Sequence, residues 1–133
     1  MLKSLMVASV ALAAGLAPVA SGDVHSQPAR APSACFLSRD WEGWKSTKDA
    51  KAMYIRVQSR KIYRLDFAYA CDEANWPDAH LVTIMRGSDW ICSPMDIDLK
   101  ISDGHGFTSP CMVRKITPLT SEEAAALPKS ERP

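Results

Sequence analysis

A first group of residues suited to chemistry lies in one stretch in the second half of the chain. Trp90–Asp98 reads WICSPMDID and holds Cys92, Asp96 and Asp98. A thiol near two carboxylates could serve nucleophilic or acid–base chemistry, and carboxylates at i and i+2 of a strand share one face, roughly 6.5–7 Å apart at their Cα atoms. Three aliphatic residues alternate with the aspartates: Ile97, Leu99 and Ile101. Because these define a buried face, we expect Asp96 and Asp98 to face solvent on the other.

A second cluster of polar side chains lies in the segment Asp72–His80, which reads DEANWPDAH. Its acids could hold calcium, yet the spacing, the glycine and the terminal glutamate of an EF-hand loop are absent. Trp76 is followed by Pro77 in this loop, so it is the tryptophan that we expect to be exposed, whereas we expect Trp90 in the core. We therefore predict a surface loop with these candidate binding residues: Trp76, Asp72, Asp78 and His80.

Other signatures of catalysis are missing from the sequence. The three histidines, His25, His80 and His105, form no pair at the helical spacing that zinc enzymes use. Neither a G-x-S-x-G elbow nor a Walker-type phosphate loop occurs. We predict no catalytic residue, no metal and no cofactor. The alternative is a secreted inhibitor or a small hydrolase that uses the Asp72–His80 loop or the Asp96/Asp98 face.

The start of the chain has the layout of a secretory signal peptide. Lys3 precedes an alanine-rich apolar run that ends in small residues, which predicts a signal peptide over residues 1–21 with cleavage near residues 20–22. The run is too short for a stable membrane span. Cleavage removes Lys3 and no acid, so 15 basic residues face 15 acidic ones, and this balance gives no footprint for nucleic acid. Residues 22–34, rich in proline, serine and alanine, predict a flexible leader.

The four cysteines lie in the segment that follows: Cys35, Cys71, Cys92 and Cys111. An exported chain meets an oxidising compartment, so an even cysteine number predicts two disulfides. A zinc site would need a short C-x₂₋₄-C pair, which is absent. Four cysteines allow three connectivities, and of these we expect the nested one, Cys71–Cys92 inside Cys35–Cys111, because it would join the two ends of the domain.

Alternation of apolar and polar residues at period two predicts several strands in residues 35–127. Residues 52–57 and 62–67, joined by polar residues, predict a hairpin, and residues 81–85 and 90–92 predict another. Residues 95–101 and 111–116 add two strands, and residues 35–44 add one or two. Thr120 and Glu123 predict a capping box that starts a short C-terminal helix. The predicted fold is mainly β, a small antiparallel barrel or sandwich of six to seven short strands, followed by a frayed tail at residues 128–133.

An ordered set of segments resembles a known family: CFLSRDWEGW, YIRVQSRKIYRLDF, WICSPMDIDL and PCMVRKITPLTSEEAAAL. The family consists of small exported four-cysteine proteins of Gram-negative bacteria and is a domain of unknown function. The resemblance covers about residues 35–128. It implies export and the four-cysteine framework, and it implies no activity, ligand or catalytic residue.

Together these features predict a periplasmic or secreted β domain without enzyme activity, which binds or supports another component of the cell envelope. Its partner is an unidentified envelope protein or ligand. An exposed apolar patch near Trp76 or the hairpin tips is expected of a binding module. A concave pocket with converging titratable groups is expected of an enzyme.

Overall fold

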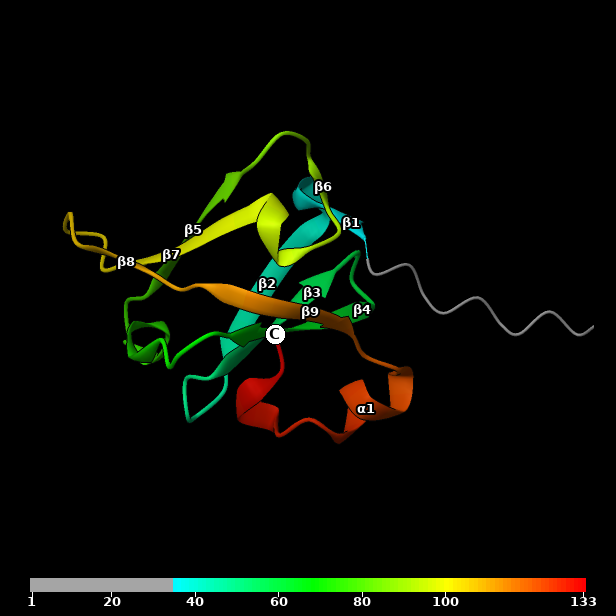
Figure 1. Cartoon of the computed structure of the whole chain (residues 1–133). Coiled ribbons are helices and arrows are strands. Elements are labelled where there is room, and N and C mark those ends of the chain that lie inside the picture. The colour runs from blue at the N-terminus through cyan, green and yellow to red at the C-terminus, as the bar shows by residue number, and fades with distance from the viewer. Residues whose placement is uncertain (1–34) are drawn as a thin grey trace, which may run out of the picture.

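The computed structural model describes residues 35–133 (Figure 1). The predicted signal peptide, residues 1–21, and the predicted leader, residues 22–34, lie outside the described residues. The described part is mainly β, with nine strands, one α-helix and four short 3₁₀ helices. The prediction of a mainly antiparallel β fold with two disulfides and one short helix is confirmed.

The strands form three antiparallel sheets. The four-stranded sheet has the order β2-β3-β4-β9, with bounds Trp41–Ser46, Ala52–Val57, Lys61–Phe67 and Val113–Pro118. The three-stranded sheet has the order β5-β7-β8, with bounds His80–Met85, Ile97–Ser102 and Thr108–Pro110. A two-stranded sheet pairs β1 (Phe36–Leu37) with β6 (Trp90–Ile91). The structure has more strands than the expected six to seven because residues 35–44 include the start of two strands, β1 and β2, and because the three-residue strand β8 lies where no strand was predicted.

The hairpin β3–β4 shows how local sequence builds the four-stranded sheet. Its register pairs Met53 with Leu65 and Ile55 with Tyr63, and all four side chains are buried. The turn between the strands puts Gln58 and Ser59 at positive φ, at 51° and 61°. Apolar residues at every second position therefore face one side of the sheet, as the period-two pattern predicted.

The core lies between the four-stranded and three-stranded sheets. Ile97, Leu99 and Ile101 of β7 belong to the same buried cluster as Met53 and Ile55 of β3. In Figure 1 the three-stranded sheet lies above the four-stranded sheet and the C-terminal segment lies below it. The arrangement is sandwich-like, and the described strands do not close into a barrel.

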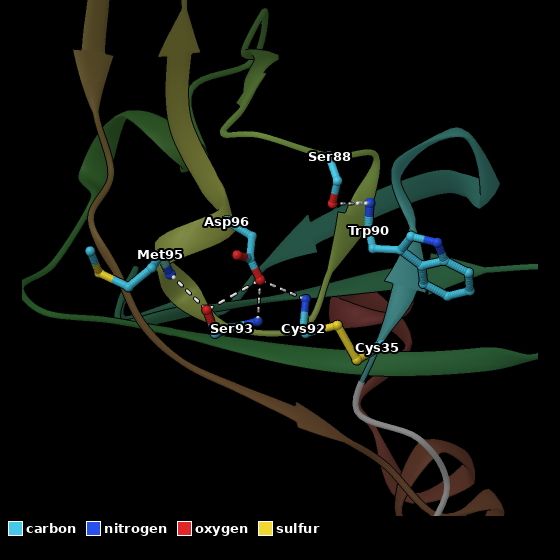
Figure 2. The surroundings of a disulfide bond; sticks show 7 residues. All are labelled: Cys35, Ser88, Trp90, Cys92, Ser93, Met95 and Asp96. Carbon is cyan, nitrogen blue, oxygen red and sulfur yellow. Dashed lines mark hydrogen bonds between the residues drawn. A yellow bond between two sulfur atoms is a disulfide. The ribbon is translucent and has the colours of Figure 1, made fainter.

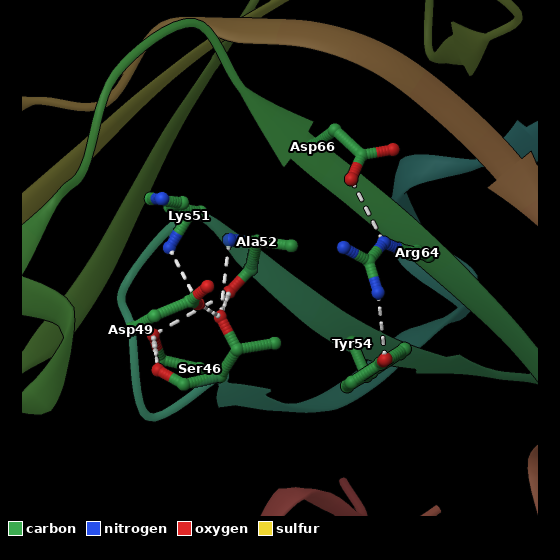
Figure 3. Close-up of polar contacts among 8 residues, drawn as sticks. Ser46, Asp49, Lys51, Ala52, Tyr54, Arg64 and Asp66 are labelled. Carbon is green, nitrogen blue, oxygen red and sulfur yellow. Dashed lines mark hydrogen bonds and ion pairs between the residues drawn. The ribbon is translucent and has the colours of Figure 1, made fainter.

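The second face of the four-stranded sheet is polar. Arg64 on β4 donates to the carboxylate of Asp66 at 2.8 Å and to the hydroxyl of Tyr54 at 3.0 Å, as Figure 3 shows. The guanidinium also lies 5.7 Å from the centre of the Tyr54 ring. Its pKa is raised above its ordinary value, chiefly by the hydrogen bond to Asp66.

The C-terminal segment packs against this sheet. Helix α1 (Ser121–Ala126) begins with the predicted capping box, in which Glu123 N–H donates to the Thr120 hydroxyl at 3.2 Å and Thr120 N–H donates to the Glu123 carboxylate at 2.8 Å. The segment expected to be a frayed tail, residues 128–133, continues this packing. A 3₁₀ helix, η4 (Lys129–Glu131), follows, and Arg56 of β3 donates to the carbonyl oxygen of Pro133 at 2.7 Å.

The disulfides join Cys35 to Cys92 and Cys71 to Cys111, so the nested pairing is wrong. The reason is a long-range pairing that the sequence pattern does not reveal. β1 pairs with β6 in the register Phe36 with Ile91, and the next pair of the same register is Cys35 opposite Cys92.

The second bridge has a clear topological role. The chain leaves the four-stranded sheet after β4, builds the three-stranded sheet and the short strand β6, and returns as β9, which pairs with β4. Cys71 stands where the chain leaves and Cys111 stands where it returns. Both are almost fully buried, so the bridge closes the inserted sheet at its base.

We expect replacement of both Cys71 and Cys111 by alanine to lower the free energy of unfolding by about 4 kcal/mol, the loop-entropy value for a closed loop of this length. Urea unfolding of the variant and the parent chain measures this difference. Peptide mapping without reductant should recover the two observed pairs from the parent. A Cys71–Cys92 peptide, or a variant as stable as the parent, would contradict the assignment.

Candidate binding groove

An apolar groove of about 420 Å³ lies where the chain crosses from β8 to β9. Three large side chains at its rim are strongly exposed: Tyr69 at 53 %, Met95 at 72 % and Met112 at 60 %. Buried strand residues, among them Leu99 and Val113, form its inner wall. Exposed apolar side chains gathered around a concave surface indicate a place where another molecule binds.

The Cys71–Cys111 disulfide positions two of the three rim residues. Met112 follows Cys111 directly, and Tyr69 precedes Cys71 by two residues. The carbonyl oxygen of Met112 accepts from Ala68 N–H at 2.9 Å, which ties the two segments together beside the bridge. The rim is therefore built by the same constraint that closes the inserted sheet.

The third rim residue, Met95, lies in the 3₁₀ helix η3 (Pro94–Asp96), which follows the Cys35–Cys92 disulfide (Figure 2). The carboxylate of Asp96 accepts from the N–H groups of Cys92 at 2.9 Å and Ser93 at 2.7 Å. The Ser93 hydroxyl in turn accepts from Met95 N–H at 3.3 Å, which completes a capping box. Asp96 thus fixes the turn that presents Met95.

This role corrects the expectation for Asp96. The strand that was expected to begin at Met95 begins at Ile97, so Asp96 stands in the preceding turn rather than on the solvent face of a strand. Its hydrogen bonds with Cys92 N–H and Ser93 N–H lower the pKa of the carboxyl from its ordinary value. Trp90, expected in the core, is half exposed beside the Cys35–Cys92 bridge.

Asp98 does lie on the outer face of β7, as expected, and it borders the groove. Its two carboxylate oxygens accept from Arg86, one from Nε at 2.9 Å and the other from the terminal nitrogen. The hydrogen bond with Arg86 lowers the pKa of Asp98 and raises that of Arg86. Because both side chains are exposed, the ion pair contributes little to stability. At the rim of the groove, Asp98 and Arg86 neutralise each other's charge.

The loop Asp72–His80 lies at another part of the surface. Trp76 is exposed, as expected, and its ring lies 5.8 Å from that of Phe107 in the turn between β7 and β8. Glu73 accepts from the Ser109 hydroxyl at 2.9 Å, and His80 lies against Gly104, where a Cβ atom would stand 3.2 Å from the imidazole Cδ2. These contacts hold the β7–β8 turn against the loop.

The predicted site residues therefore do not converge. Asp72 and Asp78 are exposed, Asp96 caps a turn, and His80 borders a different groove from Asp98. Within residues 35–133 no group of three or more histidine, cysteine or acidic side chains could hold a metal ion. The charged rim of the apolar groove suits binding, and it does not supply a nucleophile with a base within reach.

Sequence reasoning missed the groove residues Tyr69, Met95 and Met112. One signal was present for Met112, because it alternates with Cys111 and Val113, which are both buried. A strand places such a residue on the opposite face, and a methionine on an outer face is a candidate for binding. Tyr69 and Met95 carried no such signal: Tyr69 lies outside the strands, and Met95 stood at the first position of the expected strand 95–101, where the structure has η3.

The fold and the groove define the class of the molecule, a small mainly β domain stapled by two disulfides that presents an apolar groove at the junction of its sheets. Comparison with family models then identifies the family. The chain matches, over residues 1–133, the model described as "Family of unknown function (DUF6491)", and it belongs to that family. No curated protein and no solved structure matches the chain. Over residues 35–133, no helix has both the length and the apolar character needed to cross a membrane.

We expect Asp96→Asn to destabilise the protein at neutral pH, because a neutral amide oxygen accepts from the two backbone N–H groups more weakly than the ionised carboxylate does. A carboxyl whose folded-state pKa is lowered stabilises the fold above its ordinary pKa of 3.8 and loses this effect as pH falls through the folded-state value. The difference in melting temperature between parent and variant should therefore shrink below about pH 4.

Thermal unfolding followed by circular dichroism from pH 2 to pH 7 measures this difference. Asp78→Asn is a matched control, since Asp78 is an exposed loop aspartate, and it should leave the melting temperature unchanged at each pH. An Asp96→Asn variant whose deficit stayed constant across the range would contradict a role for the ionised carboxylate.

Proposed function

We propose that this protein is an exported, non-enzymatic binding module that holds an apolar segment of another envelope component in the groove rimmed by Tyr69, Met95 and Met112. The observation that carries the proposal is the groove itself, in which three large apolar side chains stay exposed around a concavity of about 420 Å³. Methionine adapts to ligands of different shape because its side chain is unbranched and polarisable.

The electrostatics of the groove favour binding over catalysis. Asp98 is paired with Arg86, and the remaining charged group at the rim is Lys100. Proton transfer requires a base with its lone pair free and a partner within hydrogen-bond distance of the reacting atom. The hydrolase alternative, which would use the Asp72–His80 loop or the Asp96/Asp98 face, lacks that support, because these side chains are engaged separately or stand apart.

Export is supported by the signal-peptide pattern of residues 1–21 and by the two disulfides of residues 35–133. Disulfides form and persist in oxidising compartments such as the periplasm. The same compartment supplies the partner in this proposal, an envelope protein or ligand with an apolar segment. Reducing the Cys71–Cys111 bridge would release two of the three rim residues, so binding in this proposal depends on oxidation.

We expect the groove to bind the apolar dye 1-anilinonaphthalene-8-sulfonate, with Lys100 and Arg86 favouring its sulfonate. In methyl NMR spectra the signals of Met95 and Met112 should shift on titration, and that of Met53, which is fully buried in the core, should not. The double variant Met95→Ser, Met112→Ser should lose most of the dye fluorescence, whereas Phe107→Ser, which removes an exposed apolar side chain elsewhere, should keep it. Equal loss in both variants would count against this groove.

We also expect the full chain, expressed in a Gram-negative host, to reach the periplasm in a form shortened at residues 20–22 and shifted by four hydrogens on reduction. Intact-mass spectrometry of the osmotic-shock fraction measures both. A photocrosslinker in place of Met112 should then yield adducts that one in place of Phe107 does not. An unprocessed chain in the cytoplasm with four free thiols would exclude the proposal.

A further inference from the structure

The outer edges of the sheets differ in how they are protected against pairing with another chain. Natural proteins blunt such edges with charged residues, proline, bulges or short length. β9 carries Arg114, Lys115 and Pro118, and β8 has three residues and ends in Pro110. β2 carries Glu42 and Lys45 and a bulge near Gly43. β5 has none of these features over its six residues, HLVTIM, and its register with β7 is unbroken.

The register of β5 shows which of its backbone groups face outward. Arg86 N–H donates to the Asp96 carbonyl at 2.9 Å, so Arg86, directly after β5, directs its N–H group to the β7 side. Orientation alternates along an antiparallel ladder, and therefore Leu81, Thr83 and Met85 direct their N–H and C=O groups away from β7. None of the backbone hydrogen bonds formed outside the helices and strand ladders of residues 35–133 uses these groups.

The free edge of β5 borders a groove whose other wall is β2. The groove has a volume of about 370 Å³, and Leu81 and Thr83 line one side while Trp41 and Trp44 line the other. Thr47 N–H donates to the Ala52 carbonyl at 2.9 Å, so by the same alternation Trp44 directs its backbone groups away from β3. Unpaired backbone groups thus line the groove on both sides.

The hydrophobic core is incompletely covered along this seam. Among residues 35–133, six apolar residues pack against the core while only partly buried. Four of them belong to β2 and β5, and a fifth directly precedes β5: Trp41, Trp44, Leu81, Met85 and Ala79. Thr83 lies opposite the buried Leu99 in the register, yet it is exposed. The core side of β5 therefore lacks a covering element at its centre.

We propose that the seam between β5 and β2 accepts one extended strand from a partner protein, with apolar side chains at every second position and no proline in the paired stretch. Such a strand would bond to the free edge of β5, place its apolar side chains over the half-covered core and connect the two sheets into one. This surface is separate from the groove around Met95, so the proposal goes beyond the function proposed above.

Other occupants fit the seam less well. Residues 22–34 of the same chain read GDVHSQPARAPSA and contain two prolines, which lack the N–H that strand pairing needs. In a second copy of the chain β5 is already paired with β7, so its edge would enter the groove as part of a sheet. The strand β2 bounds the groove on the far side. A single extended peptide needs only the width of one strand.

The test uses the full chain and a phage-displayed library of random twelve-residue peptides. Selected peptides, made synthetically, should alternate apolar and polar residues and should shift the amide signals of Leu81, Thr83 and Trp44 in NMR spectra. Thr83→Pro removes an outward N–H without touching the β5–β7 ladder, and it should weaken binding about tenfold, the loss of roughly one hydrogen bond. Thr83→Val keeps the N–H and should bind like the parent.

Two controls separate this surface from the alternatives. The Met95→Ser, Met112→Ser variant should bind the peptides with unchanged affinity, and peptides N-methylated at every second residue should not bind. The proposal would be overturned if the peptides bound the Thr83→Pro variant as tightly as the parent, or if their N-methylated forms bound as tightly as the unmodified peptides. A selection that yields no peptide able to shift these amide signals would also overturn it. So would slow hydrogen exchange at Leu81 and Thr83 in the dilute protein alone, or a dimer in sedimentation that Thr83→Pro abolishes.

Discussion

The buried Cys71–Cys111 bridge is the constraint on which the rest of the architecture depends. β4 and β9 are neighbours in the four-stranded sheet, although the chain builds a whole second sheet between them. The bridge fixes the point of departure to the point of return, so the two ends of this long insertion are held together covalently. In a domain of this size the hydrophobic core is small, and a covalent link of about 4 kcal/mol is a large part of the total stability.

The elements that local sequence determines were predictable, and those that depend on distant contacts were not. The β3–β4 hairpin and the capping box of Thr120 follow from residues close in the chain. The pairing of β1 with β6 joins residues more than fifty positions apart, and it alone decides which cysteine meets Cys35. The pattern of alternation also suggested a pair of solvent-facing aspartates, whereas the fold uses Asp96 to cap a turn through neighbours within four residues and Asp98 to pair with Arg86.

The candidate site was missed because its residues share no motif. Tyr69, Met95 and Met112 come from three segments, and each is placed by a disulfide or by the turn that follows one. Sequence reasoning searched for titratable residues close together in the chain, such as those of the Asp72–His80 loop. In this fold such residues are used to hold loops, as Glu73 does with Ser109, whereas the exposed apolar side chains gather where the two sheets are joined.

The groove around Met95 and the seam between β5 and β2 lie at opposite ends of the strand orders of the two main sheets. The chain passes directly from β8 to β9, so the two main sheets are joined along that side, where the buried bridge and the apolar groove are found. At the other end of the strand orders stand β5 and β2, which border a groove without pairing to each other. A sandwich closed on one side by a covalent bond can leave the other side unpaired and still keep its core together. The buried bridge and the partly buried Trp41 and Trp44 thus stand on the two sides of the same core.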